Sequence, residues 1–157
     1  MDQALRTYLE QTESLYASIE EWLAPTGVTI SREEVEMLEE AFGAYTAPAM
    51  TIKNGGGRAI ARMQPVAARV LGGDGRVDLT GNHQQHILIL LTEEGGPKVK
   101  GYLPSGTGRE TVMTQAYRGV GEPGWYWIES IRRGRAYRVD RVLFFDLLSG
   151  ASNYVFE

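Results

Sequence analysis

Largely apolar side chains recur every three or four positions near the start of the chain, over residues 3–24. The stripe consists of Leu5, Tyr8, Leu9, Thr12, Leu15, Tyr16, Ile19, Trp22 and Leu23. Glutamates occupy much of the remaining surface, which is the pattern of an amphipathic helix. Pro25 and Gly27 end the pattern. So wide an apolar stripe has to be buried, and we expect it to pack against the rest of the chain. The alternative is a homodimer that pairs two copies of this helix.

A second helix is predicted over residues 32–42. Ser31 precedes Glu34 by three positions, which is the spacing of a capping box. The residues that follow at helical spacing are Val35, Leu38, Ala41 and Phe42. Gly43 would cap the end of this helix. A strand is the alternative, because Val35 and Met37 alternate with glutamates, but glutamate-rich strands are uncommon.

From Ala47 onward the apolar positions alternate with polar ones, as they do in β-strands. Asn54-Gly55 lies between two such runs and is a strong hairpin signal. Residues 85–92 are apolar on both faces, so they are predicted to form a central buried strand. Turn-forming segments separate the other predicted strands, which are 66–71, 76–79, 98–103, 111–117, 125–131 and 135–139.

The C-terminal residues 140–149 are dense in apolar side chains and are predicted to form a short buried helix. Asp140 would be its N-cap and Gly150 the residue after its end, and a ninth strand is the alternative. Residues 154–156 are expected to return as an edge strand. The whole pattern predicts an α+β fold, with one or two N-terminal helices packed on a bent antiparallel β-sheet or partly open barrel of about eight strands.

Charge divides the chain at about residue 46. Residues 1–46 carry ten acidic side chains against two basic ones, whereas residues 47–157 carry fourteen basic side chains against ten acidic ones. We therefore predict a single domain over residues 1–157, made of an acidic helical arm (1–46) and a β-rich body (47–157). Such asymmetry indicates a charged partner or the docking of one half on the other.

Composition restricts the chemistry of the chain. There is no cysteine, which excludes disulfides, thiolate metal sites and thiol catalysis. The longest aliphatic run, residues 87–91, is far shorter than the ~20 residues of a membrane helix. No secretory signal pattern is visible. We therefore expect a cytoplasmic protein of bacterial type that uses no cofactor.

Catalytic motifs are sparse. Residues 119–124 have the spacing G-x-G-x-x-G, but a Trp-Tyr-Trp run follows where a dinucleotide site needs a helix, so we predict a loop between strands. His83 and His86 fall on opposite faces of a strand, and no metal site is predicted. A small metal-dependent hydrolase or nuclease would have to use Asp74, Asp78 and His86. An enzyme is therefore less expected than a binding protein.

Tryptophan and arginine gather near the end of the β-rich body. The residues concerned are Trp125, Trp127, Arg132, Arg133, Arg135, Tyr137 and Arg138. Trp, Tyr and Arg are enriched among the residues that dominate binding energy at protein interfaces. We therefore predict that these residues bind another protein, and that the chain is a non-enzymatic module of adaptor, chaperone-like or immunity type.

Nucleic-acid binding through the same residues, together with Lys98 and Lys100, is the alternative, because arginines grip phosphates and aromatic rings stack on bases. The net charge of −4 opposes it. Strand parity also opposes it, since Arg135 and Arg138 fall on opposite faces of one strand. We expect instead that Trp125 and Trp127 contribute to the core and that the arginines pair with glutamates of the N-terminal helices.

Overall fold

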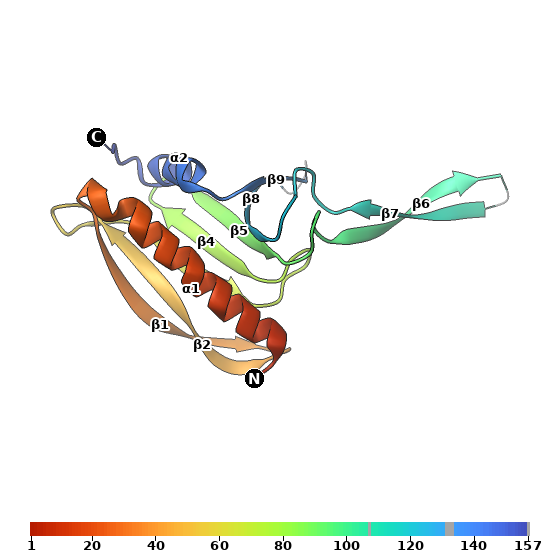
Figure 1. Ribbon diagram of the computed structural model, residues 1–157, viewed down its shortest axis with the longest axis horizontal. Helices are drawn as coiled ribbons and strands as arrows, with labels where there is room; N and C mark the ends of the chain where they lie inside the picture. The colour runs from red at the N-terminus through yellow and green to blue at the C-terminus, as the bar shows by residue number, and fades with distance from the viewer. Residues whose placement is uncertain (107, 131–133, 157) are drawn as a thin grey trace.

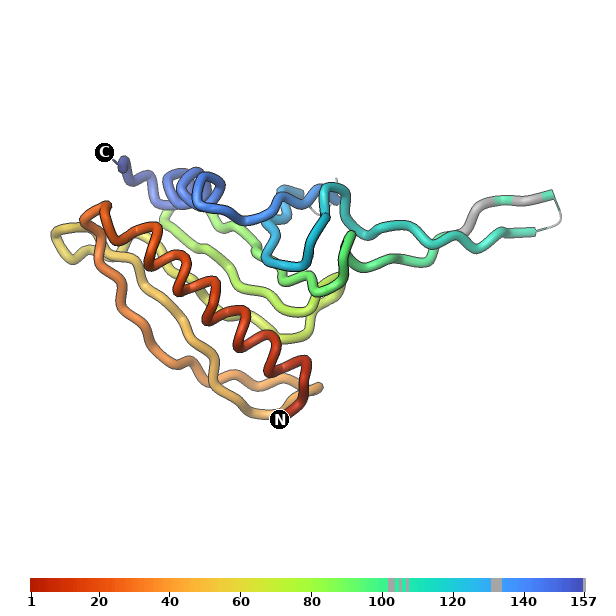
Figure 2. The backbone as a smooth tube through the Cα atoms, in the orientation of Figure 1, coloured from red at the N-terminus to blue at the C-terminus, as the bar shows by residue number. Residues whose placement is uncertain are grey.

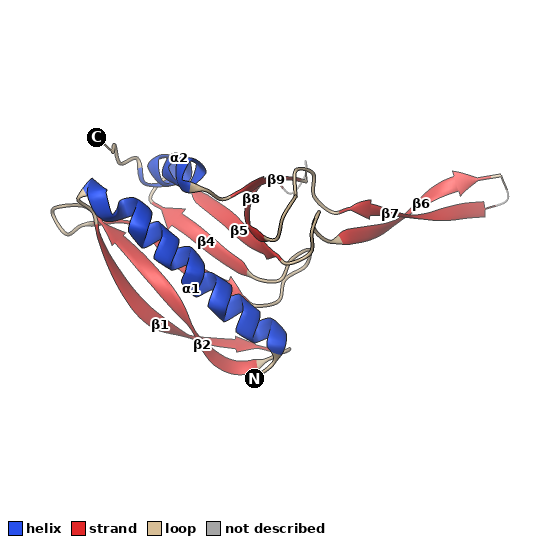
Figure 3. Cartoon of the chain, viewed as in Figure 1, coloured by secondary structure: helices blue, strands red, loops and turns tan. Residues whose placement is uncertain are grey.

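The computed structural model of this 157-residue chain describes residues 1–106, 108–130 and 134–156. Within these ranges the chain forms a long helix, nine strands and a shorter helix (Figures 1 and 3). In chain order the elements are α1 (Gln3–Leu23), a 3₁₀ turn (Ala24–Thr26), β1 (Thr29–Glu39), β2 (Gly43–Lys53), β3 (Ala59–Ala67), β4 (Arg76–Gly81), β5 (Gln85–Leu91), β6 (Lys98–Ser105), β7 (Gly108–Gln115), β8 (Gly124–Ser130), β9 (Arg135–Arg138) and α2 (Arg141–Ser152).

Seven of the strands form one antiparallel sheet in the order β1-β2-β3-β4-β5-β8-β9. Each strand lies beside its neighbour in the chain, except at the step from β5 to β8. There the chain leaves the sheet and forms β6 and β7, a separate hairpin that extends from the rest of the molecule along its longest axis (Figures 1 and 2). The predicted α+β fold is confirmed, with one N-terminal helix and a sheet that does not close into a barrel.

The predicted N-terminal helix is confirmed as α1. The carboxylate of Asp2 caps it by accepting a hydrogen bond from the backbone N–H of Ala4 at 2.8 Å. The buried members of its stripe are Leu5, Tyr8, Thr12, Leu15, Tyr16, Ile19 and Leu23. These residues share one core with side chains of α2 and of the sheet, so both helices cover the same face. The stripe is therefore covered within the chain, as expected, and is not left open for a second copy.

The predicted helix over residues 32–42 is wrong. Residues Thr29–Glu39 form β1, an edge strand that pairs along its whole length with β2. Three glutamates of β1 are exposed to solvent at this edge: Glu33, Glu34 and Glu36. The strand therefore forms without burying their charges. Gly43 is the first residue of β2, with a φ of 72°, and caps no helix. Long-range pairing with β2 outweighs the local helix propensity of glutamate.

Two of the predicted features in the middle of the chain are confirmed and one is wrong. Asn54-Gly55 lies in the turn between β2 and β3, and the predicted central strand is β5, which lies between β4 and β8. The strand predicted over residues 66–71 does not form, because β3 ends at Ala67 and a loop follows. Pro65 has no N–H to donate, and the register with β4 shifts between Pro65 and Ala67.

The four strands predicted over residues 98–139 are present, but two of them do not belong to the main sheet. β6 and β7 stand outside the main sheet. β8 and β9 form the predicted last hairpin. Residues 119–123 lie in a loop between strands, as predicted, but this loop joins β7 to β8, which belong to different sheets, and Gly124 is the first residue of β8. Arg132 and Arg133, which belong to the predicted binding residues and fall between β8 and β9, lie outside the described residues.

The predicted C-terminal helix is confirmed as α2, and the Asp140 carboxylate caps it by accepting a hydrogen bond from the backbone N–H of Leu143 at 2.8 Å. The predicted end at Gly150 is wrong, since the helix runs on to Ser152 and Asn153 takes the left-handed conformation with a φ of 57°. The edge strand predicted over residues 154–156 does not form. Phe156 instead packs edge-on against Phe145 of α2, with ring centroids 5.2 Å apart.

Candidate functional site

Apolar side chains are buried on both faces of the sheet. Along β5, Leu88 and Leu90 face the helices, whereas Ile89 and Leu91 face the opposite side, which we call the back face. The back face carries a second core cluster made of Ile89, Leu91, Tyr126, Ile128 and Ala136. Val70, Ile87, Tyr117 and Val120 pack against it and are only partly buried. Loops, and not helices, therefore cover this face.

Trp125 belongs to the core. Its residue is 6% exposed, and its indole N–H donates a hydrogen bond to the carbonyl oxygen of Gln11 on α1 at 3.0 Å. Its ring lies 6.4 Å from that of Tyr8. Trp125 therefore links α1 to the sheet, and its expected place in the core is confirmed.

A row of aromatic rings crosses β5, β8 and β9 on the helix side of the sheet. His86 meets Trp127 edge-on, with ring centroids 5.7 Å apart, and Trp127 lies 5.7 Å from Tyr137. The guanidinium of Arg135 lies 5.6 Å from the centre of the Tyr137 ring, in a cation–π arrangement. Trp127 and Tyr137 are direct cross-strand partners. This row is the part of the predicted Trp/Arg site that the structure brings together.

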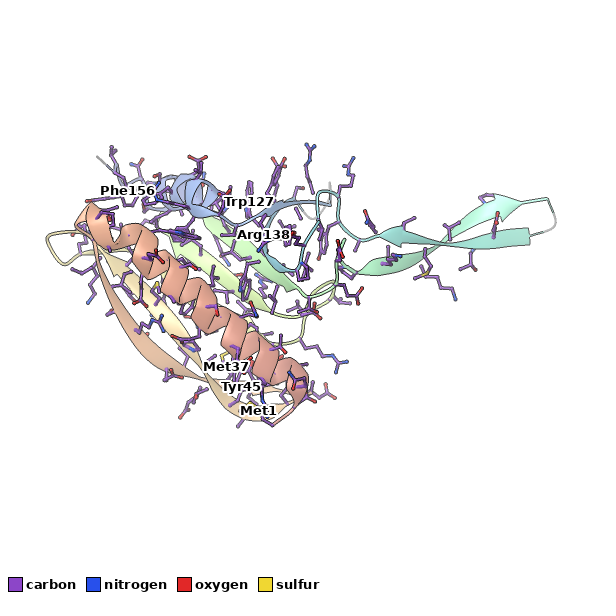
Figure 4. All side chains as sticks on the ribbon, in the orientation of Figure 1. Met1, Met37, Tyr45, Trp127, Arg138 and Phe156 are labelled. Atoms are coloured by element: carbon purple, nitrogen blue, oxygen red, sulfur yellow. The ribbon has the colours of Figure 1, made fainter. Side chains whose placement is uncertain are left out.

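Arg138 lies on the back face, away from this row. Its guanidinium is 5.9 Å from the centre of the Tyr126 ring, and its Nη1 atom is 3.8 Å from Oε2 of Glu122. Figure 4 labels Trp127 and Arg138 on their neighbouring strands. The described residues of the predicted site are thus divided between two faces, and a single arginine surface for nucleic acid gains no support.

The predicted pairing of Arg135 and Arg138 with glutamates of the N-terminal helix is wrong. Glu13 and Glu20 of α1 instead bind the guanidinium of Arg32 on β1. This guanidinium also lies 5.5 Å from the centre of the Tyr16 ring. Arg32, an arginine within the acidic N-terminal segment, therefore neutralises part of the negative charge of that segment and helps to hold α1 against β1.

A groove with a volume of about 410 Å³ lies on the back face. Its lining consists of Val70, Leu71, Arg76, Ile87, Ile89, Tyr117 and Ile128. Leu71 is 100% exposed beside this apolar lining. The sequence alone did not indicate the groove, because its residues come from five separate segments. The available signal was the apolar character of Ile87 and Ile89 on the second face of the central strand.

Glycines allow the loop over residues 68–75 to lie against β5 beside the groove. A Cβ atom on Gly73 would come within 2.3 Å of Cγ2 of Ile89, and Gly72 has a φ of 77°. The Asp74 carboxylate accepts hydrogen bonds from the backbone N–H and the hydroxyl of Thr92, both at 2.9 Å. Leu71 is therefore presented on a loop that is anchored at the end of β5.

Asp78 is a buried structural acceptor, with 5% of its residue exposed. Its Oδ1 accepts from Nε of Arg76 at 2.7 Å, and its Oδ2 accepts from Nη2 of Arg76 at 2.9 Å and from the Gln85 amide at 2.6 Å. Both carboxylate oxygens are thus occupied, and the charge of Arg76 at the groove is compensated.

The residues considered for a hydrolase do not meet. His86 lies on the helix side of β5 beside Trp127, whereas Asp78 forms its hydrogen bonds with Arg76 and Gln85 on the back face. Asp74 is engaged with Thr92. In the part of the chain that the structure describes, no three His, Asp or Glu side chains are grouped so that they could hold a metal ion.

Acidification is expected to destabilise the protein through His86. Burial beside Trp127 lowers the pKa of His86 from its ordinary value. The unfolded chain therefore binds this proton at a higher pH than the folded protein does, and the free energy of unfolding decreases as the pH falls below about 6.5. In urea unfolding at about pH 7.5 and about pH 5.5, His86→Gln should lose less stability than the wild type. His83→Gln is the control and should behave like the wild type, so equal losses in all three proteins would contradict this role.

Comparison of the chain with known protein families, with curated proteins and with solved structures finds no match. Among the described residues, no helix combines the length and the apolar content needed to cross a membrane. The two faces of the sheet are therefore the basis for inferring a function.

Proposed function

We propose that the protein is a non-enzymatic protein-binding module, and that its back-face groove holds apolar side chains of the partner. The observation that carries this proposal is the groove itself, an apolar depression of about 410 Å³ bordered by the fully exposed Leu71. Apolar surface of this kind, next to an exposed large side chain, is typical of interaction sites. The adaptor, chaperone-like or immunity-type role and the cytoplasmic setting predicted from composition belong to the same proposal.

A protein partner suits the groove better than a small molecule does. A small ligand inside the groove would cover only the part of Leu71 that lines it, because this residue lies at the border of the groove and is 100% exposed. A partner that covers both the groove and Leu71 would remove a whole leucine side chain from water, which contributes about 2 kcal/mol. The expected partner therefore presents a cluster of aliphatic or aromatic side chains.

The charge around the groove agrees with an apolar partner. Arg76 is the charged residue in the lining, and both of its hydrogen bonds to Asp78 compensate that charge. An anion bound by the remaining N–H groups of Arg76 would lie close to the buried Asp78 carboxylate, and the two negative charges would repel each other. Contact with apolar side chains leaves the pair intact.

The aromatic row on the helix side is the weaker candidate surface. Trp127 is held between His86 and Tyr137, so its ring already makes internal contacts. The row and the groove lie on opposite faces of the sheet, and a compact partner segment would not contact both. We therefore assign the main contact to the groove.

A photo-crosslinking amino acid at position 71 tests the proposal. We expect it to capture one defined partner protein in cells, and we expect the purified partner to bind the purified chain directly. Leu71→Asp should weaken that binding by about tenfold or more, because it places an unpaired charge against apolar side chains. Binding is measured by calorimetry.

Val142 provides the matched control. It is also a large, exposed apolar residue, at 69%, but it lies on α2, on the other side of the sheet. The same crosslinker at position 142 should not capture the partner, and Val142→Asp should leave the affinity unchanged. Equal capture from both positions, or an affinity that Leu71→Asp leaves intact, would overturn the assignment to the groove.

A further inference from the structure

The two open edges of the hairpin formed by β6 and β7 differ in character. The strands pair with each other over their eight residues, and neither belongs to the main sheet. β6 carries Lys98, Lys100 and Pro104, which are the residue types that discourage the addition of another strand. β7 contains the uncharged run 111–115, Thr-Val-Met-Thr-Gln. The edge of β7 is therefore the one that is open to strand pairing.

The described residues of the hairpin also pack little against the rest of the protein. It extends beyond the sheet and both helices, and the side chains drawn on it point into open space (Figures 1 and 4). Val99 and Met113 are 49% and 59% exposed. A two-stranded hairpin in water is only marginally stable by itself, and three or more strands are needed for independent stability. Additional strands would therefore stabilise it.

We propose that two copies of this chain associate by antiparallel pairing of their β7 strands about Val112. In this register Arg109 faces the partner's Gln115, Glu110 faces the partner's Thr114, and Thr111 faces the partner's Met113. No two like charges are directly opposite each other, so the edge is compatible with itself. The product is a four-stranded sheet with the order β6-β7-β7-β6 and a two-fold axis, which is the commonest symmetry of soluble oligomers.

The shape of the molecule permits this pairing. An eight-residue strand spans about 27 Å at about 3.4 Å per residue. Because the hairpin points along the longest axis, two antiparallel hairpins place the two bodies at opposite ends of the shared sheet (Figure 1). Pairing through β6 would instead place Lys98, Lys100 and Pro104 along the shared edge, and these are the residue types that disfavour the addition of a strand. This favours β7 as the shared strand.

Sedimentation equilibrium of the full chain at about 10–200 μM tests the proposal, and we expect a dimer. Val112→Lys places two lysines opposite each other at the two-fold axis and should weaken the dimer by about tenfold or more. Val99→Lys is the matched control, because cross-strand register puts Val99 and Val112 on the same face of the hairpin. Val99 belongs to β6, so this variant should remain dimeric.

A charge swap makes the test specific. Val112→Lys and Val112→Glu should each be largely monomeric, and an equimolar mixture should form a heterodimer because the opposite charges then face each other. Far-UV circular dichroism should show that all variants keep the fold. A wild type that stays monomeric, equal loss of the dimer with Val99→Lys, or a mixture that stays monomeric overturns the proposal. These outcomes are independent of the groove, since none of the substituted residues lines it.

Discussion

Tyr8→Ala is expected to lower the free energy of unfolding by about 3–5 kcal/mol, which is the cost of removing a large buried aromatic side chain. Tyr8 is completely buried between α1 and the sheet, and its ring lies 6.4 Å from that of Trp125. Removal of the ring leaves a cavity at the junction where α1 meets β8. Urea unfolding followed by tryptophan fluorescence measures the loss.

Tyr8→Phe is the matched control for this prediction. The hydroxyl of Tyr8 donates a hydrogen bond to the carbonyl oxygen of Arg76 at 2.9 Å, and burial raises the pKa of Tyr8, which keeps the hydroxyl protonated. Phenylalanine retains the ring and loses only this bond, so we expect a cost of about 1 kcal/mol. If Tyr8→Ala were no more destabilising than Tyr8→Phe, the packing of the ring would not be what holds α1 in place.

Gly81→Ala is expected to destabilise the protein by about 1–3 kcal/mol, the usual cost of overpacking a well-packed site. A Cβ atom at position 81 would lie 2.2 Å from the carbonyl oxygen of Ala151 and 2.9 Å from the backbone nitrogen of Ser152. These are backbone atoms of α2, which cannot rotate away as a side chain can. We expect α2 to shift, so its amides should exchange hydrogen faster than in the wild type.

Gly55→Ala separates this clash from a general effect of replacing glycine. Gly55 also has no positive φ, and the nearest atom to a Cβ at this position is the carbonyl oxygen of Gly27 at 4.0 Å. The substitution should change stability by less than about 0.5 kcal/mol. Faster exchange of α2 amides in Gly55→Ala, or none in Gly81→Ala, would contradict the proposed contact.

The structure shows which arginines pair with the acidic side chains of the N-terminal segment. Arg32 belongs to the acidic segment itself and binds Glu13 and Glu20 of α1. Arg62 on β3 pairs with Glu33 on β1. Of these pairs among the described residues, only that of Arg62 and Glu33 joins the basic part of the chain to the acidic part, so the docking of one part on the other accounts for little of the charge asymmetry.

The candidate site was predicted only in part. Trp127, Arg135 and Tyr137 do meet, because alternation along β8 and β9 places them on one face. The same alternation predicted that Arg138 would lie on the other face. The groove could not be predicted, because Leu71 and Tyr117 reach it from loops whose paths depend on contacts with β5 and β9.

The sequence by itself determined the elements whose signals are local. α1 follows from a stripe of 3.6-residue periodicity, the hairpin between β2 and β3 from Asn54-Gly55, and α2 from Asp140 and a dense apolar run. Backbone dihedral preferences and caps depend on neighbours in the chain, so such elements can be inferred from a short window. Only the tertiary structure decided that residues 29–39 form a strand and that β6 and β7 leave the sheet. Both outcomes depend on which other segment supplies hydrogen bonds and apolar cover, and the pattern within one segment does not contain that information.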